Sequence, residues 1–210
     1  MTDIADPRLV VPAGHDDHTH VTSTGVSNEK LAMWVFLASE CLLFGGLIST
    51  FLIYKNRVGD GALHERPHDL YDLAFTSISS FVLLMSSLTM VLAVSSAKRH
   101  DLANTRLWLA VTALLGATFI GGQVYEFTEF YKEGLGYTTN LFGSSFYTLT
   151  GFHGVHVTVG IVMLMAVRGI ITRDRITGQT DEVVELIGLY WHFVDIVWIV
   201  IFTLVYLIPA

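Results

Sequence analysis

The chain alternates between long apolar segments and short polar ones, and the apolar segments determine the fold that we expect. Each apolar segment is close to or longer than the roughly 20 residues that an α-helix needs to cross a bilayer. The pattern predicts an all-α integral membrane bundle of five transmembrane helices, which would form one domain over residues 30–210. The expected spans are residues 31–54, 73–97, 107–125, 141–167 and 186–208.

The first 29 residues are polar and lack the apolar core that a secretory signal requires. We therefore predict a flexible N-terminal tail. The stretch GHDDHTH at residues 14–20 places three histidines beside two aspartates, which would allow weak metal binding. A solvated, disordered segment is the expected state of such a polar sequence.

Composition agrees with a membrane protein, because 52% of the 210 residues are hydrophobic and only 15% are charged. The net charge of −7 describes the polar tail and loops. Cys41 is the single cysteine of the sequence. One thiol excludes an internal disulfide, a C-x-x-C-H haem attachment and an iron–sulfur cluster held by this chain alone.

Lysine and arginine residues beside the spans predict the orientation, since positive charge is retained on the cytoplasmic side. With the N-terminus inside and the C-terminus outside, eight basic residues lie inside and four lie outside. The inside set is Arg8, Lys30, Lys98, Arg99, Arg106, Arg168, Arg173 and Arg175, and the outside set is Lys55, Arg57, Arg66 and Lys132.

Ionisable residues occur deep within the apolar segments, where such side chains are costly and usually face protein. The fourth segment contains TGFHGVHVTVG at residues 150–160. A helical rise of about 1.5 Å per residue places five groups at comparable depth, so we expect them to converge near the middle of the membrane. Residues three apart should also project together. The five groups are Glu40, His153, His156, His192 and Asp195, while Gln123 and Glu126 form a separate pair nearer the outer surface.

These seven residues are candidates for buried polar groups with a structural or a proton-linked role, and none is assigned to catalysis. A carboxyl group at the depth of Glu40 must be protonated, paired or hydrated, and a histidine partner would satisfy it. Hydrogen-bonded contacts between helices are the simplest reading. A zinc or non-haem iron site and a haem with two histidine ligands are alternatives, although the sequence has no characteristic ligand motif for them.

Four blocks, in order, resemble subunit III of the haem-copper terminal oxidases over about residues 30–208. They are FLASECLLF at 36–44, GGQVYEF at 121–127, FGSSFYTLTGFHGVHVTVG at 142–160 and YWHFVDIVW at 190–198. The resemblance implies a bacterial plasma-membrane subunit that holds no redox metal, packs against catalytic subunit I, binds phospholipid and supports proton uptake. Subunit II and a small subunit IV would share the complex, with haem and copper in partner subunits. The family's glutamate, paired histidines and W-H-F-x-D residues match Glu40, His153, His156, Trp191, His192 and Asp195.

Three intramembrane histidines are too few for two haems and a copper site, so catalysis must take place in another subunit. Within the family, TGFHGVHV and YWHFVDIVW are more similar to cytochrome c oxidases than to the quinol-oxidising branch, which is the alternative. The longer family form has two further N-terminal helices that complete a lipid cleft, and here a neighbouring subunit would have to supply them. An independent small transporter or metal carrier is the alternative of another class.

Overall fold

The computed structural model describes residues 27–55, 73–134, 136–139, 141–173 and 180–208. Within these residues the chain is helical and contains no strand. Five helices are long and apolar enough to cross a membrane, which confirms the predicted fold class. They are α1 (Asn28–Lys55), α3 (Leu73–Lys98), α4 (Leu102–Lys132), α5 (Leu141–Thr172) and α6 (Thr180–Phe202), and α6 continues into a π-helix, η1 (Thr203–Leu207).

The helices extend beyond the predicted spans because a helix can continue into polar residues after it leaves the hydrocarbon. The largest difference is in α4, which begins five residues before the predicted Leu107 and ends seven after Tyr125. Asp101 caps its start and accepts a hydrogen bond from the Asn104 N–H at 3.1 Å. Residues 1–26 of the predicted tail lie outside the described residues, and they include the GHDDHTH stretch.

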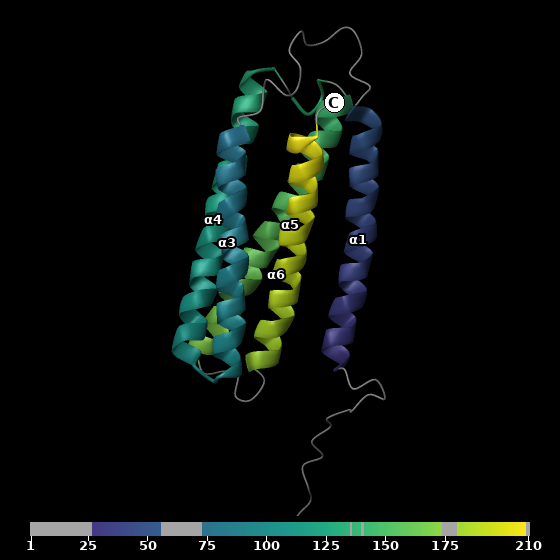
Figure 1. The fold of residues 1–210 in the computed structure, drawn as a ribbon. Helices are drawn as coiled ribbons and strands as arrows, with labels where there is room; N and C mark the ends of the chain where they lie inside the picture. The colour runs from purple at the N-terminus through teal and green to yellow at the C-terminus, as the bar shows by residue number, and fades with distance from the viewer. Residues whose placement is uncertain (1–26, 56–72, 135, 140, 174–179, 209–210) are drawn as a thin grey trace, which may run out of the picture.

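The five helices run side by side along one long axis (Figure 1). The start of α1, the end of α3 and the start of α6 share one end of the bundle, which we call the Lys98 end. The end of α1 and the C-terminal η1 share the other end, which we call the Lys55 end. The predicted cytoplasmic location of the Lys98 end stays a prediction.

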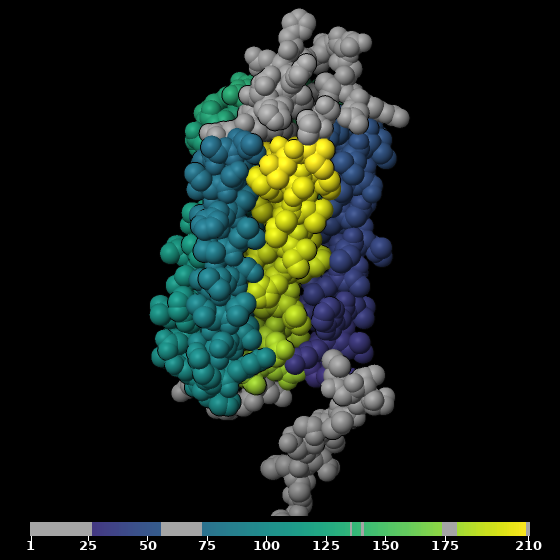
Figure 2. Space-filling model, viewed as in Figure 1, coloured from purple at the N-terminus to yellow at the C-terminus, as the bar shows by residue number. Residues whose placement is uncertain are grey.

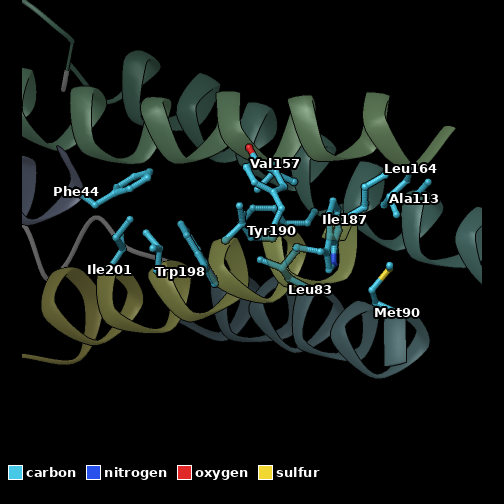
Figure 3. Close-up of a cluster of buried hydrophobic side chains, with 14 of the residues drawn as sticks. Phe44, Leu83, Met90, Ala113, Val157, Leu164, Ile187, Tyr190, Trp198 and Ile201 are labelled. Carbon is cyan, nitrogen blue, oxygen red and sulfur yellow. The ribbon is translucent and has the colours of Figure 1, made fainter. Parts of the chain in front are cut away.

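Helices α3, α4, α5 and α6 form a tightly packed unit. Trp191 of α6 is fully buried and lies against Gly160 of α5 and Gly116 of α4. A Cβ atom at Gly160 would lie 2.8 Å from the Trp191 ring, and one at Gly116 would lie 2.6 Å from it. Side chains at these two positions would therefore displace the indole. Figure 3 shows the apolar core between the helices, with Leu83, Val157 and Trp198 among its members.

Helix α1 packs on α5 and α6 along one edge of the bundle (Figure 2). Its buried apolar residues are Leu37, Phe44 and Phe51, which recur every seven residues. A seven-residue period gives one narrow seam along a helix. Most of the remaining surface of α1 is exposed and apolar, as expected of a helix that faces lipid or another membrane protein.

Candidate functional site

The contact between Glu40 and His156 joins α1 to α5 in the middle part of the bundle. His156 Nδ1 lies 2.8 Å from the Phe152 carbonyl oxygen, and because that oxygen can only accept, Nδ1 carries the hydrogen. His156 Nε2 lies 3.1 Å from Glu40 Oε2. One proton shared along this contact therefore satisfies both groups. The Tyr190 hydroxyl donates to the His156 carbonyl at 3.0 Å and adds α6 to the same junction.

This junction is open to the surface of the bundle on one side. The Glu40 and His156 side chains are each 15% exposed. They lie beside a groove of about 290 Å³ whose other walls are apolar. The groove is lined by Met33, Phe36, Val155, His156, Val159, Met163 and Tyr190.

His153 points in a different direction from His156. It is fully buried and stacks on Trp198 at 4.8 Å between ring centroids, with the Phe119 ring edge-on at 5.9 Å. Among the described residues, neither ring nitrogen of His153 has a hydrogen-bond partner. The prediction that the two histidines project together is wrong, because the angle of about 60° between them is enough to place them on different helix interfaces.

The side chains of α6 make a row of hydrogen bonds with serines of α3. Trp198 Nε1 donates to the Ser80 hydroxyl at 2.9 Å, and Trp191 Nε1 donates to the Ser86 hydroxyl at 2.9 Å. His192 Nδ1 lies 2.7 Å from the Ser87 hydroxyl. These contacts join α3 and α6 along about two turns of each helix.

Asp195 belongs to the same interface as His192. Its side chain is 3% exposed and lies near Ser87, and among the described residues neither of its carboxylate oxygens has a hydrogen-bond partner. The sequence spacing correctly places Asp195 and His192 near one another on α6. The serines of α3 that bond to α6 were not among the predicted site residues. The seven-residue spacing of Trp191 and Trp198 was nevertheless a signal that one continuous face of α6 packs against a neighbouring helix.

Gln123 and Glu126 form the separate pair that their position in the sequence suggests. Gln123 Nε2 donates to Glu126 Oε2 at 3.1 Å, and the Thr76 hydroxyl donates to Glu126 Oε1 at 2.7 Å. All three side chains are buried. The pair thus joins α4 to α3, away from the Glu40 contact on α1.

The predicted convergence of five ionisable groups is wrong. Glu40 and His156 meet between α1 and α5, whereas His192 and Asp195 face α3 and His153 lies against Trp198. Within the described ranges, no three His, Cys, Asp or Glu side chains come together as a metal-binding group. The side chains considered for a zinc, iron or haem site therefore serve separate helix interfaces.

Two further polar contacts hold α1 at its ends, and sequence reasoning missed both. At the Lys55 end, Lys55 Nζ donates to the carbonyl oxygen of Leu204 at 2.8 Å and to that of Ile208. At the Lys98 end, Lys30 Nζ lies 3.3 Å from Glu185 Oε2. Partners of this kind are distant in sequence, and two are backbone atoms, so side-chain patterns do not reveal them.

Comparison with known proteins finds relatives along nearly the whole chain. Residues 10–209 match the family described as Cytochrome c oxidase subunit III. The chain is 40% identical over 177 residues to quinol oxidase subunit 3 of Bacillus subtilis, covering 84% of this chain and 85% of that protein. It is 38% identical over 180 residues to cytochrome c oxidase subunit 3 of Bacillus sp. PS3, covering 86% of each. Cytochrome bo(3) ubiquinol oxidase subunit 3 of Pseudomonas aeruginosa is 36% identical over 197 residues, covering 94% and 92%.

Proposed function

The chain belongs to the cytochrome c oxidase subunit III family of the haem-copper oxidases, and from this premise we propose how it acts within the oxidase. Membership makes it a multi-pass subunit of a respiratory, oxygen-reducing complex in a bacterial membrane. Our proposal is that it is a non-catalytic subunit of a proton-pumping oxidase. It would stabilise the catalytic subunit I by direct packing, with subunit II and a small subunit IV in the same complex.

The observation that carries this proposal is how the polar side chains of the membrane helices are used. Glu40 and His156 join α1 to α5, whereas His192 and Glu126 join α6 and α4 to α3, and these contacts fix the packing of the bundle. Contacts of this kind hold membrane helices in register. A bundle fixed in this way provides a firm surface for a catalytic partner that holds the haem and copper.

A proton-linked role is proposed for Glu40 and His156 in particular. They differ from His153 and Asp195 in being partly exposed and within hydrogen-bond distance of one another, so a proton can move along one contact. The apolar groove beside them fits a phospholipid acyl chain, as the family's lipid binding suggests. Both roles support the complex without any redox centre in this chain.

Cytochrome c is the electron donor that we propose, with quinol as the alternative. The proposal rests on the TGFHGVHV and YWHFVDIVW motifs, because relatives named for both donors match about equally well. The experiment is to extract a tagged chain in mild detergent, identify the accompanying proteins and record their haem spectrum. Oxygen consumption is then measured with reduced cytochrome c and with ubiquinol.

The expected result is that haem-bearing subunits accompany the chain and that reduced cytochrome c supports the faster oxygen consumption. Faster oxygen consumption with ubiquinol would overturn the assignment of cytochrome c as the donor and leave the subunit assignment unchanged. A chain that purifies without haem-bearing partners, or that carries its own stoichiometric iron or copper, would overturn the assignment as a non-catalytic subunit. Transport by such an isolated chain would instead support the transporter alternative.

A further inference from the structure

A crevice of about 420 Å³ lies between α3 and α6 at the Lys98 end, away from the groove beside His156. It runs along the helices from Arg99 to Val91, which is about 12 Å at the helical rise per residue. Figure 1 shows that α3 and α6 lie side by side there. Its lining residues are Val91, Val94, Ser95, Lys98, Arg99, Glu185, Gly188, Leu189 and His192.

The charged side chains of this crevice lie at its mouth, and most of the walls beyond them are apolar. Lys98 and Arg99 lie at its mouth and are exposed, and Lys98 is the last residue of α3. Val91, Val94 and Leu189 form the walls farther into the span. Gly188 lets the helices approach, because a Cβ there would lie 3.1 Å from Val94 Cγ2. The crevice therefore has a charged mouth and mostly apolar walls, with Ser95 on one wall and His192, which contacts Ser87, at the inner end.

The charge at the mouth is unevenly balanced. The crevice is lined by two cations, Lys98 and Arg99, and by one carboxylate, Glu185. Glu185 is shared, since its Oε2 lies 3.3 Å from Lys30 Nζ and 3.7 Å from Lys98 Nζ. Arg99 makes a long contact of 3.5 Å with the Ser96 hydroxyl, so most of its hydrogen-bond donors remain for another group.

Two other carboxylates of this end of the bundle lie outside the crevice, and one of them, Asp101, interacts electrostatically with Arg99. Asp101 accepts hydrogen bonds from the backbone and the side chain of Asn104, and Glu182 accepts one from Ser27. Neither residue lines the crevice. The lining itself carries one more positive charge than negative charge, which favours an anion at the mouth, and its apolar walls fit a hydrocarbon chain on that anion.

We propose that this crevice binds an anionic glycerophospholipid. Its phosphate lies against Lys98 and Arg99, and one acyl chain runs along Val91, Val94 and Leu189. Basic pockets between membrane helices commonly bind acidic headgroups. The proposal rests on the proposed function in one respect: it adds a second phospholipid site, between α3 and α6, to the phospholipid binding proposed above.

The test uses the chain purified in mild detergent with the subunits that accompany it. The sample is titrated with dioleoyl phosphatidylglycerol or dioleoyl phosphatidylcholine, and native mass spectrometry measures how much lipid is bound. The double variant Lys98→Gln/Arg99→Gln removes both cations. The control variant Lys132→Gln/Arg173→Gln removes the same charge from two exposed positions outside the crevice. Each basic residue is expected to contribute a roughly fivefold gain in affinity for an anionic lipid. The first variant, which lacks two of them, should therefore bind phosphatidylglycerol about 30-fold more weakly.

A second pair of variants tests the acyl-chain part of the site. Val91→Phe fills the crevice, whereas Leu88→Phe adds the same kind of ring one turn earlier on α3, outside the lining. Only Val91→Phe should lower the number of phosphatidylglycerol molecules retained. This pair also shows whether a loss of binding comes from a disturbed helix, because both substitutions lie on exposed positions of α3.

Equal affinity of the unmodified protein for the two lipids, or equal losses in the charge variant and its control, would overturn the proposal. Binding unchanged by Val91→Phe would also overturn it. These failures are distinguishable from failure of the proposed function. If haem-bearing subunits still accompany the chain, the subunit assignment stands whatever the lipid result, and their absence would refute that assignment alone.

Discussion

Helices α1 and α3 are both long, apolar membrane spans, yet they are packed in different ways. Nine residues of α3 are buried, and five of these are serine or threonine. Four residues of α1 are buried, of which two are phenylalanine. Small residues let α3 lie close to α4 and α6, whereas bulky residues connect α1 to α5 and α6 at widely spaced points.

Apolar character alone therefore does not determine how a membrane helix is held. Between lipid and protein there is little hydrophobic driving force, so close packing and polar contacts decide association. Helix α3 has both along most of its length. Helix α1 has a seam of three apolar side chains, one polar contact in its middle and a few at its ends.

The strongest test of the close-packed unit is Gly160→Val. The added side chain would overlap the buried Trp191 ring, so we expect destabilisation by about 3 kcal/mol or more and loss of the folded bundle. Size-exclusion chromatography and thermal unfolding in detergent measure this. Gly151→Val is the matched control on the same helix, since nothing lies within 4 Å of a Cβ at Gly151. Equal stability of the two variants would contradict the described packing.

Substitution of Glu40 should loosen α1 and leave the other four helices packed. Glu40→Ala removes the partner of His156, and we expect a loss of about 1 to 2 kcal/mol. Glu40→Gln keeps a hydrogen-bonding group and should lose less stability, while weakening any proton-linked role. Hydrogen exchange of the α1 amides compares the two variants. An Ala variant with unchanged exchange and normal turnover would refute the importance of this contact.

Lys55→Met should have a smaller and more local effect. The ammonium group bonds two carbonyl oxygens near the C-terminal end, and their loss should cost about 1 kcal/mol. Limited proteolysis from the C-terminus should become faster. Lys132→Met is the control, because the one ion pair of Lys132 within the described residues is with exposed Glu129 on its own helix. Equal protease resistance of both variants would contradict the proposed restraint.

The smallest expected effect concerns the cap of α4. Hydrogen bonds from the backbone and side chain of Asn104 lower the pKa of Asp101 below its ordinary value of 3.8. The charged cap therefore stabilises the fold above pH 3.8, and this contribution is lost as pH falls through the lowered pKa. Asp101→Ala should lower the melting temperature slightly at pH 7, with a difference that narrows toward pH 3. A difference independent of pH would contradict this account.

The sequence was sufficient to predict five spans and a Glu40 partner among the histidines. Both depend on position along a helix axis, which follows from residue number and rise per residue. The convergence of His153, His156 and Asp195 was wrong because depth says nothing of direction around the axis. That direction is fixed by packing between helices, here by the Trp191 ring between Gly116 and Gly160. The residue pattern of one segment therefore cannot predict it.

The Lys55 contact has a consequence for the synthesis of the protein. Lys55 and Leu204 are 149 residues apart, so at typical rates of synthesis Leu204 is added about 7 to 30 s after Lys55. Glu40 likewise precedes its partner by 116 residues. Helix α1 is thus synthesised well before the residues that secure it, and until then the insertion machinery, a chaperone or lipid must accommodate its glutamate.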